Sequence, residues 1–357
     1  MTVDLTTLDA HEQPSDHLRK IWKGYSRADG VAILSAGEVD DLSVPEKLSE
    51  FRQSGSIPAE KIRSALSHLA EDDPSIAEVK QDAAVYHHPL IPESETKFIP
   101  KDPSVHKTLS MKQVMERRLH WVTLGGQYDW TNRVYPGEKP PAFPEDVAGL
   151  LETLFPETQA QAAIVNFYTP GDTMMMHRDV SEETDKGLVS LSIGCDALFM
   201  IAPNDVGKMS EADRPAQGEK EYLLLRIRSG DAIYMTQEAR FAWHGVPKVI
   251  KGTCPEYLAD WPAEDGKYEE WRGWMSNKRI NLNLVQITNR QGIENNRQSE
   301  NGACDGHSWQ HHRTEFSAPS NPISVAPTEE LGRAHLFFQQ GMTRHPTRAC
   351  AHATELS

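Results

Sequence analysis

The sequence has little cysteine and no long apolar run, and each of these absences excludes a common class of protein. Only four cysteines occur among 357 residues, and no two are spaced as Cys-x-x-Cys. The sequence therefore predicts neither a disulfide framework nor a thiolate zinc site, and a reducing compartment is expected. No apolar stretch approaches the roughly 20 residues that a membrane-spanning helix needs, so we expect no membrane partner.

Basic residues are also scarce. The chain has 37 lysines and arginines against 52 acidic residues, which gives a formal net charge of -15. This excess argues against a protein that coats nucleic acid with its whole surface, but it leaves room for a local basic groove. The first residues lack the basic and apolar character of a signal or transit peptide. We expect an intracellular protein and leave nucleus, cytoplasm and mitochondrion open.

Composition divides the chain into three parts. Residues 1–85 form a polar, partly helical N-terminal extension, with short helices expected at 16–23 and 59–69, and we interpret it as a docking or regulatory arm. Residues 86–286 contain the folded domain, which begins with a proline-rich linker. Residues 287–357 are rich in Asn, Gln, Ser, His and Arg and have little periodicity, so we expect this tail to be mostly disordered.

Short strands joined by tight turns predominate in the central part. They are expected at Ala162–Tyr168, Leu188–Gly194, Ala197–Ala202, Tyr222–Arg228, Asp231–Met235 and Arg279–Leu284. The second and third are expected to pair, and the fourth and fifth to form a hairpin. Helices are expected at Ser104–Leu119, at Glu145–Leu154 and near 268–276. This pattern indicates an antiparallel sandwich or jelly roll.

A candidate metal site is visible in two separate stretches. His177 and Asp179 follow an apolar strand, and alternate residues of an extended chain share a face, so their side chains would meet at one point. His244, after a later strand, is the best candidate for a third ligand. Two histidines and one carboxylate with open positions suit non-haem Fe(II). On spacing alone, a solvated strand end is an equally good interpretation.

Other candidate residues carry weaker signals. Tyr128 and Trp130 could stack on a flat base, although core packing is the commoner use of tryptophan. Arg117 and Arg118 could touch a phosphate or form a solvated helix end. The pair His87-His88 is expected in a loop. The spacing of four tail residues fits no closed zinc site; these residues are Cys304, His307, His311 and His312.

A series of short motifs occurs in a fixed order between Ser104 and Leu284. The motifs are Trp121-Val-Thr-Leu-Gly, Tyr128-Asp-Trp130, Asn166-x-Tyr168, His177-x-Asp179, Leu191-Ser-Ile-Gly194, Ser229-Gly-Asp231, Arg240-x-x-x-His244-x-Val-Pro247 and Arg279-x-Asn281. One such motif means little, but their order and spacing are specific. The chain resembles the AlkB family of Fe(II)/2-oxoglutarate-dependent dioxygenases, and more closely its eukaryotic homologue-1 branch.

The resemblance implies the fold and the iron ligands. It implies an α+β fold whose core is a double-stranded β-helix, or jelly roll, with flanking helices. It also implies that His177, Asp179 and His244 bind Fe(II), which agrees with the triad inferred from the residues themselves.

The resemblance further implies how the cosubstrate and the substrate bind. Arg279 would form a bidentate salt bridge to the distal carboxylate of 2-oxoglutarate, and Asn166 and Tyr168 would hydrogen-bond the same molecule. The implied reaction consumes O2 and 2-oxoglutarate, releases succinate and CO2, and hydroxylates an N-methyl group in tRNA or DNA, which then leaves as formaldehyde. Tyr128 and Trp130 are our candidates for holding the flipped base.

One departure from the family pattern bears on activity. The family usually carries a second arginine six residues after the first, and here that position is Val285, which predicts weaker binding of 2-oxoglutarate. Recognisable folded sequence also ends at Val285, and one hypothesis is that the remainder derives from an unspliced intron. Two rival functions remain open: a dioxygenase acting on methylated histone or another protein, and a catalytically impaired jelly-roll binding module.

Overall fold

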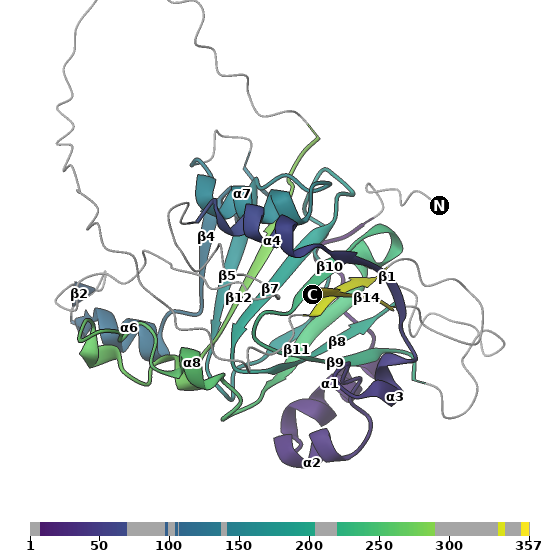
Figure 1. Ribbon diagram of the computed structural model, residues 1–357, viewed down its shortest axis with the longest axis horizontal. Helices are drawn as coiled ribbons and strands as arrows, with labels where there is room; N and C mark the ends of the chain where they lie inside the picture. The colour runs from purple at the N-terminus through teal and green to yellow at the C-terminus, as the bar shows by residue number, and fades with distance from the viewer. Residues whose placement is uncertain are drawn as a thin grey trace, which may run out of the picture.

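Two sheets packed face to face form the centre of the protein, which we describe from a computed structural model (Figure 1). The structure describes residues 8–69, 97–98, 104–105, 107–136, 141–203, 220–289, 335–339 and 351–356. The expected loop at His87-His88, most of the proline-rich linker and the candidate tail cluster at Cys304 lie outside these residues.

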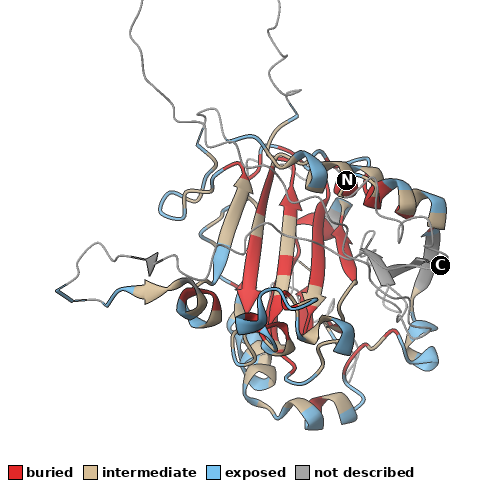
Figure 2. Cartoon of the chain, turned by 60° about the vertical axis from the view of Figure 1, so that its left-hand side comes forward, coloured by how far each residue is buried: buried red, intermediate tan, exposed pale blue. Residues whose placement is uncertain are grey.

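The larger sheet has eight strands and contains most of the predicted ones. In spatial order they are β1 (Arg52–Ile57), β14 (Ala351–Leu356), β13 (His335–Gln339), β10 (Ala232–Met235), β7 (Leu188–Gly194), β12 (Arg279–Val285), β5 (Ala162–Tyr168) and β4 (Trp121–Gly125). This sheet is antiparallel except where β1 pairs with β14 and β10 pairs with β13. Figure 2 shows the central strands of this sheet buried along most of their length. Apolar side chains on its outer face pack under α4 (Ala59–Leu66) and α7 (Glu145–Leu154).

The smaller sheet has four antiparallel strands and closes the other side of the sandwich. Its spatial order is β6 (Met174–His177), β11 (Trp243–Val249), β8 (Ala197–Ala202) and β9 (Leu223–Ile227). The space between the sheets holds one apolar cluster, which includes Phe199, Ile201 and Val246. The outer face is covered by α1 (Asp16–Arg27) and α2 (Gly30–Ser35), which bury Leu18 and Ile33. This two-layer arrangement is the predicted jelly roll.

Two predicted strand pairings are wrong. β7 and β8 lie in different sheets, as do β9 and β10, so neither pair forms a hairpin. Gly194 occupies the corner after β7 with φ of 95°, and a Cβ there would come within 2.4 Å of the Lys278 carbonyl oxygen. Glycine therefore allows the chain to leave one sheet and enter the other. Short connections suggested hairpins because sequence spacing alone does not distinguish a turn from a corner.

The N-terminal segment is part of the packed structure. The expected helices at 16–23 and 59–69 are present as α1 and α4, and Leu42 reaches the cluster between the sheets. Asp40 forms a bridge to β9, where its backbone N–H donates to the Leu224 carbonyl at 2.8 Å. Described residues of the predicted extension thus cover one face of each sheet.

Several predicted boundaries also need correction. The expected helix from Ser104 to Leu119 is reduced to α6 (Met111–Arg117), preceded by β3 (Leu109–Ser110), which pairs with β2 (Lys97–Phe98). The region near 268–276 holds two short 3-10 turns in place of one helix. The remaining helical elements are α3 (Pro45–Leu48), η3 (Gln237–Phe241), α8 (Glu256–Ala259), η4 (Glu269–Trp271) and η5 (Met275–Asn277).

The described chain continues past Val285 to Asn289. Gln161 Oε1 accepts hydrogen bonds from the backbone N–H groups of Ile287 at 2.8 Å and Thr288 at 2.9 Å. The Ile287 carbonyl accepts from Glu183 at 2.8 Å. These contacts are long-range in sequence, so composition could not reveal them. Farther on, β13 and β14 are strands within a region expected to be mostly disordered. Among the described helices, none is both long and apolar enough to cross a membrane.

The link between the N-terminal segment and β9 should make stability depend on pH. Arg228 Nη2 donates to Asp41 Oδ2 at 2.7 Å. Burial acts to raise the pKa of Asp41, but hydrogen bonds from Arg228 and Ser43 outweigh it and lower the pKa from 3.8 to about 2. Because the folded pKa lies below the unfolded one, this stabilisation is complete above pH ~4 and is lost as pH falls through ~2.

We therefore predict that Asp41→Asn lowers the free energy of unfolding by about 2 kcal/mol at pH 7 and by less at pH 3. Urea denaturation at a series of pH values measures the difference. Asp265→Asn removes an exposed carboxylate and should change little at any pH. A difference for Asp41→Asn that stays constant from pH 7 to pH 3 would contradict the argument.

Candidate active site

The three predicted metal ligands meet at one point between the sheets. β6 and β11 pair so that His177 lies directly opposite His244, and their ring centroids are 4.4 Å apart. Asp179 follows two residues after His177, with its carboxylate 3.7 Å from His177 Nε2 and 3.4 Å from His244 Nε2. One ligand atom from each residue lies within 4.8 Å of the others, and no second cluster of this kind occurs in the described residues.

Backbone carbonyls fix the orientation of both imidazoles. His177 Nδ1 donates to the Met175 carbonyl at 2.8 Å, and His244 Nδ1 donates to the Ala242 carbonyl at 3.0 Å. Since Nδ1 carries the proton in each ring, the Nε2 lone pair is free to point toward the shared centre. The Phe199 ring stacks beside His244 at 5.7 Å and limits its rotation.

The charges around the triad favour the protonation states that a metal requires. Burial acts to raise the pKa of Asp179, but its contact with His244 and the nearby His177 and Arg240 hold that pKa well below its usual range. Burial lowers the pKa of His177, and the neighbouring His244 lowers it further. A neutral imidazole beside an ionised carboxylate is the form in which these residues bind a divalent cation. The donor set and its geometry fit Fe(II).

Arg279 presents unpaired donors inside the sandwich. The residue is 1% exposed, and its Nη2 donates to Ser192 Oγ at 2.8 Å. Its Nε and Nη1 are buried without a hydrogen-bond partner. Burial lowers the pKa of Arg279, but a guanidinium remains charged at neutral pH. A buried cation with free, coplanar donors fits the carboxylate of a dicarboxylic acid such as 2-oxoglutarate.

Asn166 and Tyr168 lie beside Arg279 because β5 pairs with β12. The register sets Tyr168 against Arg279 and Asn166 against Asn281. The Arg279 guanidinium lies 5.3 Å from the Tyr168 ring centroid, which supports the cation from one side. Asn281 Nδ2 donates to the Leu191 carbonyl at 3.0 Å. Two serines of β7, Ser190 and Ser192, share this polar face and alternate with apolar residues along the strand.

Val285 is an apolar residue that packs between the two sheets. It is 5% exposed, belongs to the cluster between the sheets and pairs with Ala162. The position that carries a second arginine in the resembled family therefore contributes packing here. Among the residues of β12, Arg279 is the only cation, and it is buried.

Arg240 is a functional residue whose role the sequence analysis missed. It is fully buried, and its guanidinium donates to the Asp179 carbonyl at 2.7 Å, the Lys186 carbonyl at 2.8 Å and Glu182 Oε2 at 2.9 Å. Burial raises the pKa of Glu182, and Arg240 counteracts that rise. Arg240 thus holds the loop that carries Asp179, which makes it a positioning residue. In the sequence, the signal that could have identified Arg240 is its spacing from a metal ligand in the motif Arg240-x-x-x-His244.

Tyr128 and Trp130 belong to an exposed aromatic cluster near the triad. Tyr128 lies 4.8 Å from Trp130 and 5.2 Å from Tyr135, and Trp130 lies 5.1 Å from Trp121, measured between ring centroids. Burial raises the pKa of Tyr128, the hydrogen bond with Ser181 counteracts that rise, and the negative charge of Asp179 adds to it. This 3.0 Å hydrogen bond joins the cluster to Ser181, two residues after Asp179. Trp130 is 49% exposed. Core packing is therefore not its role, whereas Arg117 and Arg118 form an exposed helix end.

A jelly roll that holds a His-Asp-His triad and a buried, incompletely paired arginine defines the class of mononuclear iron, 2-oxo-acid-dependent oxygenases. Residues 78–284 match the family model described as the 2OG-Fe(II) oxygenase superfamily. The chain belongs to this superfamily and, within it, to the homologue-1 branch of the AlkB family.

Three relatives illustrate this similarity. The chain is 56% identical to "N6-methyladenosine RNA demethylase ALKB1" of Pyricularia oryzae, over 80% of this chain and 99% of the relative. It is 80% identical to "N6-methyladenosine RNA demethylase ALKBH" of Cryphonectria parasitica, over 62% of this chain and 98% of the relative. It is 40% identical to "tRNA demethylase abh1" of Schizosaccharomyces pombe, over 51% of this chain and 57% of the relative.

Replacing Arg279 should weaken 2-oxoglutarate binding more than it weakens metal binding. We predict that Arg279→Gln raises the dissociation constant for 2-oxoglutarate at least 30-fold, since loss of one partner from a buried charge pair costs about 2 to 5 kcal/mol. Calorimetry with Mn(II) in place of Fe(II) measures both affinities. Arg117→Gln, which changes an exposed arginine, serves as the control. Equal affinities for 2-oxoglutarate in the two variants would show that Arg279 does not bind it.

Proposed function

We propose that this dioxygenase removes methyl groups from N-methylated nucleobases in RNA, including tRNA, and in DNA. The observation that carries the proposal is the triad and the unpaired donors of Arg279 within one sandwich, beside exposed aromatic rings. Relatives named as RNA and tRNA demethylases support the choice of nucleic acid. A plant relative is named as a DNA N(6)-methyladenine demethylase, which supports DNA as a further substrate.

The residues divide the reaction between them. His177, Asp179 and His244 would hold Fe(II), which when bound supplies the oxygen chemistry that couples 2-oxoglutarate oxidation to hydroxylation of a methyl group. Arg279 would bind the distal carboxylate, so that the 2-oxo end is directed toward the metal. Asn166 and Tyr168 are proposed to hydrogen-bond the same cosubstrate. The apolar cluster between the sheets excludes water from this region.

The aromatic cluster is proposed to receive the methylated base. A base in a duplex must leave its stack before its methyl group can reach a metal, and a flipped base binds well between aromatic rings. Trp130 and Trp121 are both exposed, at 49% and 43%, and Tyr128 links them to the metal loop through a 3.0 Å hydrogen bond with Ser181. Their position favours a flat substrate over a methylated lysine, whose recognition would use a closed cage around a cation.

Succinate release provides the direct test of the proposed function. We predict that the chain with Fe(II) and O2 releases formaldehyde from a methylated RNA and an equal amount of succinate from 2-oxoglutarate, and much less of both with the unmethylated RNA. His177→Ala should reduce both products to background because a metal ligand is lost. His17→Ala, which removes a surface imidazole paired with Glu221, should retain full activity. Turnover with a methylated peptide but with neither RNA nor DNA would overturn the proposal.

Removal of the Trp130 side chain tests the substrate role of the aromatic cluster. We predict that Trp130→Ala raises KM for a methylated RNA about tenfold, because stacking on one base contributes about 1 to 3 kcal/mol. The dissociation constant for 2-oxoglutarate should stay within twofold of the original value. Tyr257→Ala, which removes another half-exposed aromatic ring, is the matched control. A KM equal to that of the control would remove Trp130 from the substrate site.

A further inference from the structure

A basic helix lies beside the strand that carries the first metal ligand. Although the chain has a net charge of -15, α1 carries four basic residues and one acidic one. Arg19, Lys23 and Arg27 are spaced four residues apart, so they form one row along the helix, which we term the basic face of α1. All three are exposed. Arg19 pairs with Asp16, and no carboxylate in the described residues forms an ion pair with Lys23 or Arg27.

Specific contacts anchor α1 to the smaller sheet. Trp22 Nε1 donates to the Met174 carbonyl at 3.0 Å, and Lys248 Nζ donates to the Ser26 carbonyl at 3.1 Å. Leu18 is completely buried against the outer face of the sheet. The segment before the helix is held by an ion pair between Glu12 and Arg178, the residue that follows His177. The basic face therefore has a defined position relative to the metal ligands.

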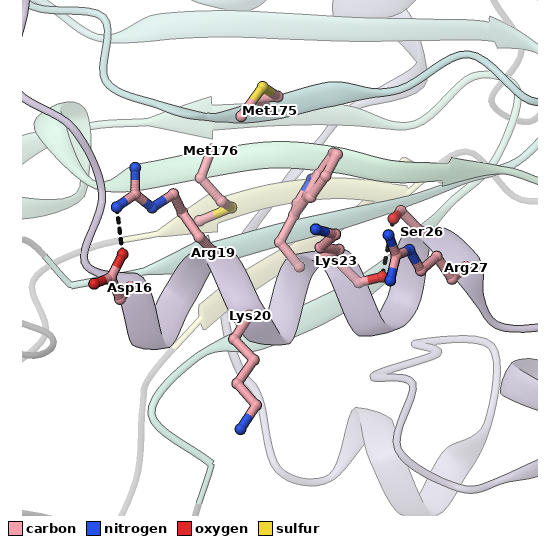
Figure 3. A pocket seen from close by; sticks show the side chains of 9 residues that line it. Asp16, Arg19, Lys20, Lys23, Ser26, Arg27, Met175 and Met176 are labelled. Carbon is pink, nitrogen blue, oxygen red and sulfur yellow. Dashed lines mark hydrogen bonds and ion pairs between the residues drawn. The ribbon is translucent and has the colours of Figure 1, made fainter.

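A surface pocket of about 570 Å³ lies beside the contact between this helix and β6. Its lining includes Arg19, Lys23 and Arg27 of the helix and Met175 and Met176 of the strand. In Figure 3, Arg19 and Lys23 extend from α1 toward the strand, whereas Lys20 points away from it. Met176 points from the strand toward α1, whereas Met175 points away from the helix and is 58% exposed. The helix side of the pocket carries a row of cations, which suits a polyanion.

The pocket lies close to the metal site along the chain. β6 is the edge strand of the smaller sheet, and it continues from Met175 to His177 at its end. Two residues of strand advance about 6.6 Å. The strand presents His177 toward the interior between the sheets and Met176 toward the cluster beneath α1. A ligand along the basic face would thus lie against the outer side of the strand that bears the metal ligand.

We propose that the basic face of α1 binds the phosphodiester backbone of the substrate RNA, next to the nucleotide whose base enters the active site. This inference rests on the proposed function. The distance from Arg19 to Arg27 is about 12 Å at 1.5 Å per residue. Phosphates of one strand in a helix are spaced about 3.4 Å apart along the axis, so the face can contact three or four of them.

The geometry favours a nucleic acid over other anionic ligands. The cations form a row and do not converge on one point, as they would to bind a single phosphate. The apolar side of α1 is already packed against the smaller sheet, so it is not available for insertion into a lipid bilayer. Position next to β6 also places an extended anion beside the site where a base would react.

The test compares two double variants that remove the same charge. Lys23→Gln with Arg27→Gln changes the basic face while it preserves helix-forming residues and the Trp22 anchor. Lys251→Gln with Lys267→Gln removes two exposed lysines elsewhere. Binding of a 20-nucleotide single-stranded RNA is measured by fluorescence anisotropy at several salt concentrations, with the full chain loaded with Mn(II) and 2-oxoglutarate.

We predict that the basic-face variant loses about 25-fold in RNA affinity at 0.1 M salt. The slope of log affinity against log salt should fall by about 1.4, since each contact with a single-strand phosphate contributes about 0.7. The control variant should keep both values. The loss in kcat/KM should be greater for a methylated 20-nucleotide RNA than for a methylated trinucleotide, because a trinucleotide cannot occupy the whole face.

The outcomes separate this inference from the proposed function. If the unmodified chain demethylates RNA but the basic-face variant binds like the control, the basic face does not bind substrate and the proposed function stands. If the unmodified chain releases no succinate with any methylated nucleic acid, the proposed function itself fails. Loss of binding only to an acidic peptide or to vesicles of anionic lipid, with RNA affinity retained, would also overturn the inference.

Discussion

The antiparallel pairing of β6 with β11 is the interaction on which the metal site depends. It sets His177 opposite His244 and directs both rings into the space between the sheets. A shift of one residue in this register would turn His177 to the outer face, because neighbouring residues of a strand point in opposite directions. β6 has only four residues and lies at the edge of its sheet, so pairing with β11 alone fixes its register weakly. The hydrogen bond from Trp22 of the N-terminal segment to the Met174 carbonyl also fixes its position.

The larger sheet provides a polar surface within an otherwise apolar core. Along β12, Arg279 and Asn281 face the same side as the serines of β7, while Leu284 packs against the helices on the other side. Most buried polar groups in folded proteins have hydrogen-bond partners. Asn281 has three within the protein, whereas Arg279 has one for its three donor atoms. The region is therefore complete in packing and incomplete in hydrogen bonding.

Much of the site could be predicted from the sequence because its residues occur at strand ends with period-two spacing. The alternation around His177 and Asp179 predicted that these two side chains meet at one point, and the spans of β5, β7 and α7 were predicted correctly. The sheet crossing at Gly194 could not be predicted, since a glycine after a strand is compatible with either a turn or a corner. Arg240 was missed because its partners, two carbonyls and Glu182, are distant in sequence.

The unpaired donors of Arg279 would couple the binding of a carboxylate to the stability of the folded state. An unsatisfied buried donor costs about 1 to 3 kcal/mol, and here Nε and Nη1 both lack a partner within the protein. A carboxylate that satisfies them binds the native chain and not the unfolded one, so it raises stability in proportion to the logarithm of its concentration. Occupancy of this site would then act on the lifetime of the folded chain as well as on catalysis.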